Sequence, residues 1–145
     1  MRTDRELLEL AAKAAGMNLG RYADGWNWSN DGPRGAGVYK IDPNQSPVGN
    51  PRFKFLFWNP LTDDGDALQL AVKLGLTVCN EHESAGAVYC TRAETEDFPT
   101  VRSGNIGDAP GITEADYAAT RRAITRAAAE IAAQHPRTDG GGHGS

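Results

Sequence analysis

Apolar residues recur at helical spacing in three stretches of the chain and at strand spacing in several shorter ones. The first helical stretch follows Thr3, and the spacing from Thr3 to Glu6 predicts a capping box. The stretch ends at Gly16, because glycine suits the left-handed conformation that often closes a helix. The pattern predicts an amphipathic helix between these positions, with an inner face formed by Leu7, Leu8, Ala11 and Ala15.

The second helical stretch runs from Leu61 to Leu74. Its first free N–H groups have three candidate acceptors, Asn59, Thr62 and Asp63, and Gly75 suits its left-handed end. One face carries Leu61, Leu68, Ala71 and Val72, and the apolar surface continues round the side through Ala67, Leu70 and Leu74. Since only a narrow polar stripe is left, we expect this helix to be buried on most sides.

The third helical stretch begins near Thr113, whose spacing to Asp116 indicates a weaker cap, and Pro136 stops it. Its apolar stripe is predicted to consist of Tyr117, Ile124, Ala128 and Ile131.

Strand patterns lie between the helices. Phe53 to Trp58 is almost wholly apolar, which is typical of a strand buried on both faces. Thr77 to Asn80 and Gly86 to Thr91 form a hairpin pattern, and Thr100 to Arg102 suggests one more short strand. Residues 20–51 are rich in Gly, Pro, Asn and Asp, which predicts a long loop with at most a short edge strand from Val38 to Ile41.

Two runs carry a resemblance to a known family: WNPLTDDGDALQLAVKLGL from Trp58 and YAATRRAITRAAAEIA from Tyr117. With these runs the chain resembles small tailed-phage and prophage proteins described as having an alpha-beta-alpha sandwich domain. The resemblance covers Thr3 to Ala15 and then Arg52 to Gln134. It implies a fold and a phage setting, and it leaves the activity open because most members of the family have no assigned role.

The order helix, strand, helix, hairpin, helix predicts a mixed α/β (α+β) class. We expect a single-domain alpha-beta-alpha sandwich over residues 1–136, with a small, mainly antiparallel sheet covered by helices on both faces. Residues 20–51 would form an insert that carries tryptophan, and residues 137–145 a disordered tail.

Composition narrows the classes of function. A net charge of −4 argues against a binder of duplex nucleic acid or of an anionic membrane, because such proteins need a concentrated basic face. No apolar run is long enough to span a membrane, and Met1 to Ala15 lacks the features of a signal peptide. We therefore expect a protein of the bacterial host's cytoplasm, with no cofactor.

Cysteine and histidine offer little chemistry at this level. Cys79 and Cys90 would face each other if the hairpin turn is centred on Ser84 and Ala85, yet two free thiols are the expectation in a reducing cytoplasm. Together with His82 they supply three zinc ligands, but no fourth is near and the paired Cys-x-x-Cys spacing is missing. A Cys–His nucleophilic pair is disfavoured because the hairpin tip is expected to be wet.

The acids Asp63, Asp64 and Asp66 allow an alternative interpretation, a small metal-dependent hydrolase built on this acidic corner. Asp63 and Asp66 are three residues apart and share a helix face, whereas Asp64 points elsewhere. Acids at a helix start are also explained by capping and by the helix dipole alone. We therefore predict a structural role for them.

Aromatic and cationic residues give the strongest functional signal. Trp26 and Trp28 lie in the predicted loop, where a core position is less expected than on a strand, and arginines recur early in the last helix. Residues of these two kinds stack on bases, anchor partners or hold phosphates. The predicted binding residues are Tyr22, Trp26, Trp28, Arg34, Arg121, Arg122 and Arg126.

These patterns favour a nonenzymatic phage accessory protein of the counter-defence type. It would bind a host defence protein or sequester a nucleotide-like signalling molecule, and the sequence does not separate the two. The hydrolase and a structural phage protein are the alternatives. A homo-oligomer fits as well, because pockets of sequestering proteins often lie at subunit interfaces.

Overall fold

Four helices and seven short strands make up the part of the chain that the computed structural model describes, residues 2–17, 19–20, 25–41, 55–93, 96–103 and 111–134. The helices are α1 (Asp4–Ala14), α2 (Asp64–Leu74), α3 (His82–Ala85) and α4 (Glu114–Gln134). The strands are β1 (Asn27–Gly32), β2 (Gly35–Ile41), β3 (Phe55–Trp58), β4 (Leu76–Glu81), β5 (Ala87–Arg92), β6 (Glu96–Asp97) and β7 (Val101–Arg102).

The helix ends follow the local signals in the sequence. Thr3 Oγ1 accepts from the Glu6 N–H and Glu6 Oε1 accepts from the Thr3 N–H, so the predicted capping box of α1 is confirmed. Asp63 is the cap of α2, since its Oδ1 accepts from the Asp66 N–H at 2.9 Å. Gly75 closes α2 in the left-handed conformation, as predicted, with φ of 68°.

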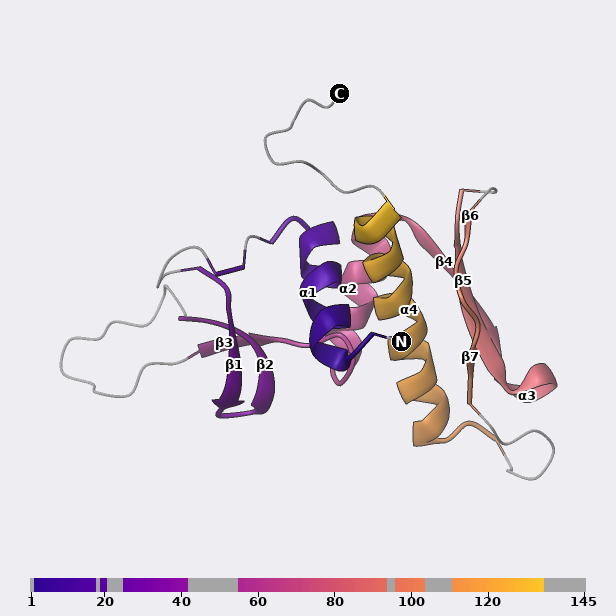
Figure 1. Ribbon diagram of the computed structural model, residues 1–145. Helices are drawn as coiled ribbons and strands as arrows, with labels where there is room; N and C mark the ends of the chain where they lie inside the picture. Colours follow the sequence, from indigo (N-terminus) through magenta and orange to yellow (C-terminus); the bar gives the residue numbers. More distant parts are fainter. Residues whose placement is uncertain are drawn as a thin grey trace.

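Helices α1, α2 and α4 run in the same direction (Figure 1). The ion pairs of two neighbouring arginines of α4 agree with this alignment, because Arg122 pairs with Asp4 at the start of α1 and Arg121 pairs with Asp64 at the start of α2. At the other end, Leu74 of α2 and Ile131 of α4 line one cavity together with the last turn of α1.

Alanines form much of the surface at which the helices meet, including Ala11 in α1, Ala67 in α2 and Ala127 in α4. Small side chains let helix axes approach closely. Leu70, Val88 and Phe98 fill the remaining space of the core. Within the described residues, no helix is long and apolar enough to cross a membrane.

Two antiparallel sheets flank the helices (Figure 1). One has the order β1-β2-β3, and in the other β4-β5-β6 is extended by β7, which also pairs with β5. The predicted mixed α/β class, with small antiparallel sheets in one small domain, is confirmed. The arrangement differs in detail from the expectation of one sheet covered on both faces, because the three long helices lie between two sheets in Figure 1.

The predicted loop at residues 20–51 contains a hairpin, so this prediction was wrong for β1 and β2. Val38 to Ile41 belongs to β2, which is the central strand of its sheet and not an edge. Two glycines of this hairpin leave room for aromatic rings. A Cβ on Gly37 of β2 would lie 2.5 Å from the Phe57 ring, and one on Gly32 of β1 would lie 2.3 Å from the Tyr39 ring. Residues that indicated a loop therefore make room for aromatic rings in a sheet.

Strand β3 is an edge strand, so the prediction of a strand buried on both faces was wrong. Phe55 is 46% exposed and Leu56 is 39% exposed. Phe53 and Lys54, the first residues of the predicted strand, lie outside the described residues.

The hairpin of β4 and β5 is confirmed, and β7 matches the predicted short strand. The register differs by one residue from a turn centred on Ser84 and Ala85, so that Cys79 faces Tyr89 and Cys90 faces Val78. Because side chains alternate between faces, the two cysteines point to opposite faces of the sheet, and both are free thiols.

Two apolar side chains of α2 are more exposed than predicted. Leu68 is 63% exposed and Val72 is 73% exposed, whereas Leu70 is only 2% exposed. Helix α4 covers α2 on the side of Ala67, Leu70 and Ala71 and leaves the opposite side uncovered. Tyr117 of α4 is also exposed, contrary to prediction. It lies one helical turn before Arg121 and Arg122, the residues of α4 that pair with the first turns of α2 and α1.

Candidate functional site

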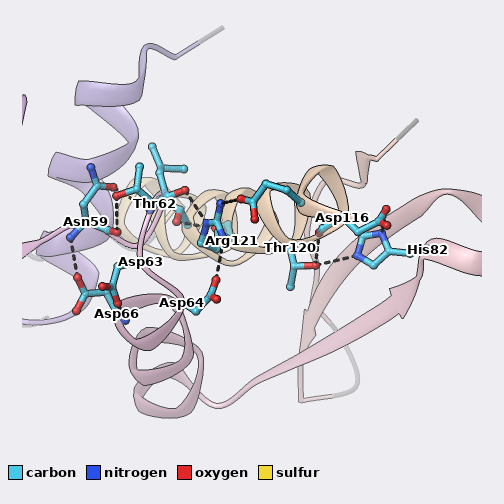
Figure 2. Close-up of polar contacts among 12 residues, drawn as sticks. Asn59, Thr62, Asp63, Asp64, Asp66, His82, Asp116, Thr120 and Arg121 are labelled. Atoms are coloured by element: carbon cyan, nitrogen blue, oxygen red, sulfur yellow. Dashed lines mark hydrogen bonds and ion pairs between the residues drawn. The ribbon is translucent and has the colours of Figure 1, made fainter. Parts of the chain in front are cut away.

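The acidic corner before α2 forms three separate contacts (Figure 2). Asp63 caps the helix, and Asp66 Oδ2 accepts from the Asn59 N–H at 2.9 Å. Asp64 pairs with Arg121 at 2.7 Å. The three carboxylates therefore do not converge, and among the described residues no group of three or more His, Cys, Asp or Glu side chains is placed to hold a metal ion.

Asp66 is the acid of this corner whose pKa is raised. Partial burial is the main cause, and the nearby charge of Asp63 adds to it, while the Asn59 N–H and the charge of Arg34 act in the opposite direction. The folded protein thus favours the protonated form of Asp66. Protonated Asp66 therefore contributes to the stability of the fold below the unfolded-state pKa of about 3.9, and this contribution is lost as the pH rises through the folded-state pKa.

We expect Asp66→Asn to become more stable relative to the parent as the pH rises from acid to neutral. The amide keeps an oxygen that accepts from the Asn59 N–H, and it carries no charge to desolvate. The relative gain should be below about 1 kcal/mol, because Asp66 is only partly buried. Urea unfolding of both proteins at a series of pH values measures it. If the parent instead becomes more stable relative to the variant as the pH rises, the pKa of Asp66 is not raised in the folded protein.

His82 is the centre of a buried polar cluster that joins three segments. The residue is 6% exposed and follows β4 as the first residue of α3. Its Nδ1 lies 2.9 Å from Ser103 Oγ and 3.4 Å from Asp116 Oδ1, and its Nε2 lies 2.8 Å from Thr120 Oγ1. Figure 2 shows the imidazole against the first turns of α4. The expectation of a wet hairpin tip was wrong for His82, although Glu83 and Ser84 beside it are exposed.

The hydroxyl protons of this cluster fix the ring's tautomer. Thr120 Oγ1 donates to the Asp116 backbone carbonyl at 2.8 Å, so it must accept from an Nε2–H of His82. Ser103 contacts both Nδ1 and the Asp116 carboxylate. The Ser103 hydroxyl has one proton, so it donates either to Nδ1 or to the Asp116 carboxylate.

Serine, histidine and aspartate meet here without the arrangement of a catalytic triad. In a triad the nucleophile and the acid contact opposite ring nitrogens, whereas Ser103 and Asp116 both lie at Nδ1. Thr120 lies at Nε2, but its proton is held by a helix carbonyl and the His82 side chain is almost fully covered. The geometry supports a structural junction between the second sheet and α4.

Asp116 has a lowered pKa within this junction. The hydrogen bond from the Thr113 backbone N–H is the largest cause, and the Ser103 hydroxyl and the charge of His82 act in the same direction. The same Thr113 bond, 2.8 Å long, is one half of the predicted cap of α4, whereas the Thr113 hydroxyl donates to the Asp116 carboxylate and does not accept from the Asp116 N–H. Asp116 therefore contributes stability that is present above its unfolded-state pKa and is lost as the pH falls through its folded-state pKa.

Cys90 is unsuited to nucleophilic or metal chemistry. Burial raises the pKa of its thiol to about 12, with a smaller contribution from Cys79. The thiol stays protonated at neutral pH, and only the thiolate attacks or binds zinc. His82 contacts hydroxyl groups and Asp116, so the three zinc ligands considered from the sequence are not brought together.

Trp28 lies in β1 and Trp26 directly precedes that strand, and a cation lies over the ring of each. The predicted residue Arg34 lies over another ring of the first sheet, that of Phe57. The Arg5 guanidinium lies 5.0 Å from the Trp28 ring, Lys40 Nζ lies 5.9 Å from the Trp26 ring, and Arg34 lies 5.4 Å from the Phe57 ring. The Trp28 indole N–H also donates to Asn30 at 2.9 Å. Both tryptophans already have partners within the chain. Tyr22 lies outside the described residues.

The three predicted arginines of α4 have different surroundings. Arg121 is largely covered and donates to Asp64, Glu114 and the Leu61 carbonyl, so it holds α2 in place. Arg122 pairs with the exposed Asp4 at 2.9 Å. Arg126 forms no ion pair within the described part of the chain. Glu130, four residues further along the same helix, binds Arg2 at 2.6 Å.

An open groove between α1 and α4 brings together arginines from both ends of the sequence. Its volume is about 860 Å³. It is lined by Arg2, Asp4, Glu6, Leu7, Arg122, Arg126 and Glu130. We name this the arginine groove. It contains two of the predicted residues, Arg122 and Arg126, and none of the tryptophans.

Sequence reasoning missed Arg2 and the His82 cluster. Arg2 precedes the capping box of α1, and nothing local shows that it meets Glu130, 128 residues later. His82 followed a polar run typical of an exposed turn, so its burial gave no signal either.

No protein-family model matches this chain, and comparisons with curated proteins and with solved structures find no match. The resemblance to phage proteins therefore stays a prediction.

Proposed function

We propose that this chain is a nonenzymatic binding protein that holds an anionic, phosphate-bearing ligand in the arginine groove. The observation that carries the proposal is Arg126, a cation that lines the groove without an ion pair among the described residues. A volume of about 860 Å³ is in the range of small-molecule sites.

The other two arginines of the groove are held only by partly exposed ion pairs. Arg122 pairs with Asp4 and Arg2 pairs with Glu130. Exposed pairs of this kind are worth about 0 to 1 kcal/mol each. A hydrogen bond to a charged group such as phosphate is worth about 1.5 to 3 kcal/mol, and arginine binds phosphate with two parallel N–H groups. A ligand with several phosphate oxygens can therefore replace the carboxylates.

In the phage setting that the resemblance implies, such a ligand is a nucleotide-like signalling molecule of the host. The protein would act against host defence by sequestering it in the host cytoplasm. The arginines of the groove support this proposal, because arginine is well suited to phosphate groups. The tryptophans do not line the groove, so they are not part of this proposed site. Phosphate groups would thus provide most of the recognition.

A second candidate is binding to a host defence protein. The exposed Leu68 and Val72 favour it, because they are one helical turn apart on α2 and form an uncovered apolar strip. Apolar anchors on an exposed helix face are typical of protein contacts. In that case the variants that weaken partner binding would lie on α2 and not in the groove.

We expect Arg126→Gln to weaken binding of adenosine triphosphate or inorganic pyrophosphate by about tenfold or more, since it removes a charge-assisted contact. Isothermal titration calorimetry measures the effect, and the parent's affinity should fall as salt is added. Arg102→Gln is the matched control, because it removes the same charge from an exposed position on β7 outside the groove lining.

Three results would count against the arginine groove. The parent could bind neither probe, the control could weaken binding as much as Arg126→Gln, or uncharged adenosine could bind as tightly as the triphosphate. Unchanged melting temperatures of both variants would show that the fold is intact.

A further inference from the structure

The three-stranded sheet has two edges, and only one is protected against pairing with another strand. At the β1 edge the register is irregular between Ser29 and Gly32, and Asp31 is exposed. Bulges and charges of this kind discourage edge pairing. Strand β3 has neither feature: its four residues, Phe55 to Trp58, pair with β2 in unbroken register and carry no charge.

The outer edge of β3 is also free within the described residues, because the sheet ends there. In an edge strand every second residue points its backbone N–H and C=O groups away from the sheet. These groups need a hydrogen-bonding partner or water.

The side chains of β3 indicate what kind of surface would cover this edge. Phe55 and Leu56 are adjacent, so they point to opposite faces of the sheet, and both are exposed. A helix laid on one face would cover only one of them. A further strand in the plane of the sheet would flank both and would also satisfy the free backbone groups.

We propose that β3 pairs antiparallel with β3 of a second copy of this chain, forming one continuous sheet across a two-fold axis. A two-fold contact places the same surface against itself, so it requires a self-complementary strand. The sequence Phe-Leu-Phe-Trp meets this condition, because each apolar side chain would meet another and no charge would be buried.

The contact is small, since it rests on a strand of four residues. Interfaces below about 1,200 Å² are commonly weak or transient. The dimer should therefore form in a concentration-dependent way. It does not involve the arginine groove, so its failure would leave the proposed function untouched.

Sedimentation velocity of the full chain over a series of protein concentrations tests this dimer. We expect a shift from monomer to dimer as the concentration rises. Phe55→Lys and Leu56→Lys should each weaken the dimer by about tenfold or more, because each puts a charge against the apolar side chains of the partner strand. Val72→Lys is the matched control: it puts the same charge on an apolar residue that is 73% exposed on α2, and the dimer should persist.

Hydrogen exchange of the unmodified chain gives a second readout that does not depend on the variants folding. Amides of residues 55–58 should exchange more slowly as the protein concentration rises, while those of β1 should not change. The proposal is overturned if the parent stays monomeric at every concentration, if both lysine variants dimerise like the parent, or if Val72→Lys dissociates the dimer equally.

Discussion

Replacing Leu70 by alanine is expected to lower the free energy of unfolding by about 2 to 5 kcal/mol. Leu70 is only 2% exposed and packs into the core cluster between α2 and α4. Removing its side chain loses burial of apolar surface and leaves a cavity that the alanine-rich helices around it have few large side chains to fill. Urea unfolding of parent and variant measures the loss.

Leu68→Ala is the matched control for this prediction. It removes the same atoms from the same helix at a position that is 63% exposed, so the change should stay within about 0.5 kcal/mol. The sequence pattern alone predicts similar losses for both residues. If both variants lose equal stability, the uncovered side of α2 has been placed wrongly, and if neither does, α2 is not part of the core.

Replacing His82 by alanine is expected to cost about 2 to 4 kcal/mol. The change removes a buried ring together with its hydrogen bonds to Ser103 and Thr120 and its contact with Asp116. Ser103 after β7 and Thr120 in α4 would then lose the ring that joins them. Thermal and urea unfolding report the loss.

Two variants separate the causes of this effect. Glu83→Ala changes the exposed residue next to His82 and should stay within about 0.5 kcal/mol of the parent. His82→Phe restores the ring volume without the donors, and it should remain destabilised by about 1 to 3 kcal/mol because polar groups are left without partners. Parental stability in His82→Phe would show that the polar contacts contribute nothing.

Features of the fold that depend on near neighbours could be predicted from the sequence. The capping box of Thr3 and Glu6, the Asp63 cap and the left-handed Gly75 each involve residues within one helical turn. The hairpin of β4 and β5 was also predictable, because its strand patterns are separated by a short polar run. In all these cases the chemistry of a few adjacent residues determines the geometry.

Features that depend on distant packing could not be predicted. Helical periodicity predicts that Leu68 and Leu70 are both buried, and only the position of α4 decides which of them is covered. Gly32 and Gly37 resembled loop residues until the rings of Tyr39 and Phe57 were seen against them. Of the candidate site, Arg122 and Arg126 were predicted because arginines recur early in the last helix, but Arg2 joins them only through the docking of α1.

The parallel alignment of α1 with α4 has a consequence for how the chain folds during synthesis. The pairs that fasten these helices, Asp4 with Arg122 and Arg2 with Glu130, span 118 and 128 residues. Contacts this far apart in sequence form slowly, because a long loop must close before they contribute. On the ribosome, α1 emerges before α4, and its apolar face is not covered until α4 has been made. Nascent chains halted before α4 should therefore bind chaperones through α1.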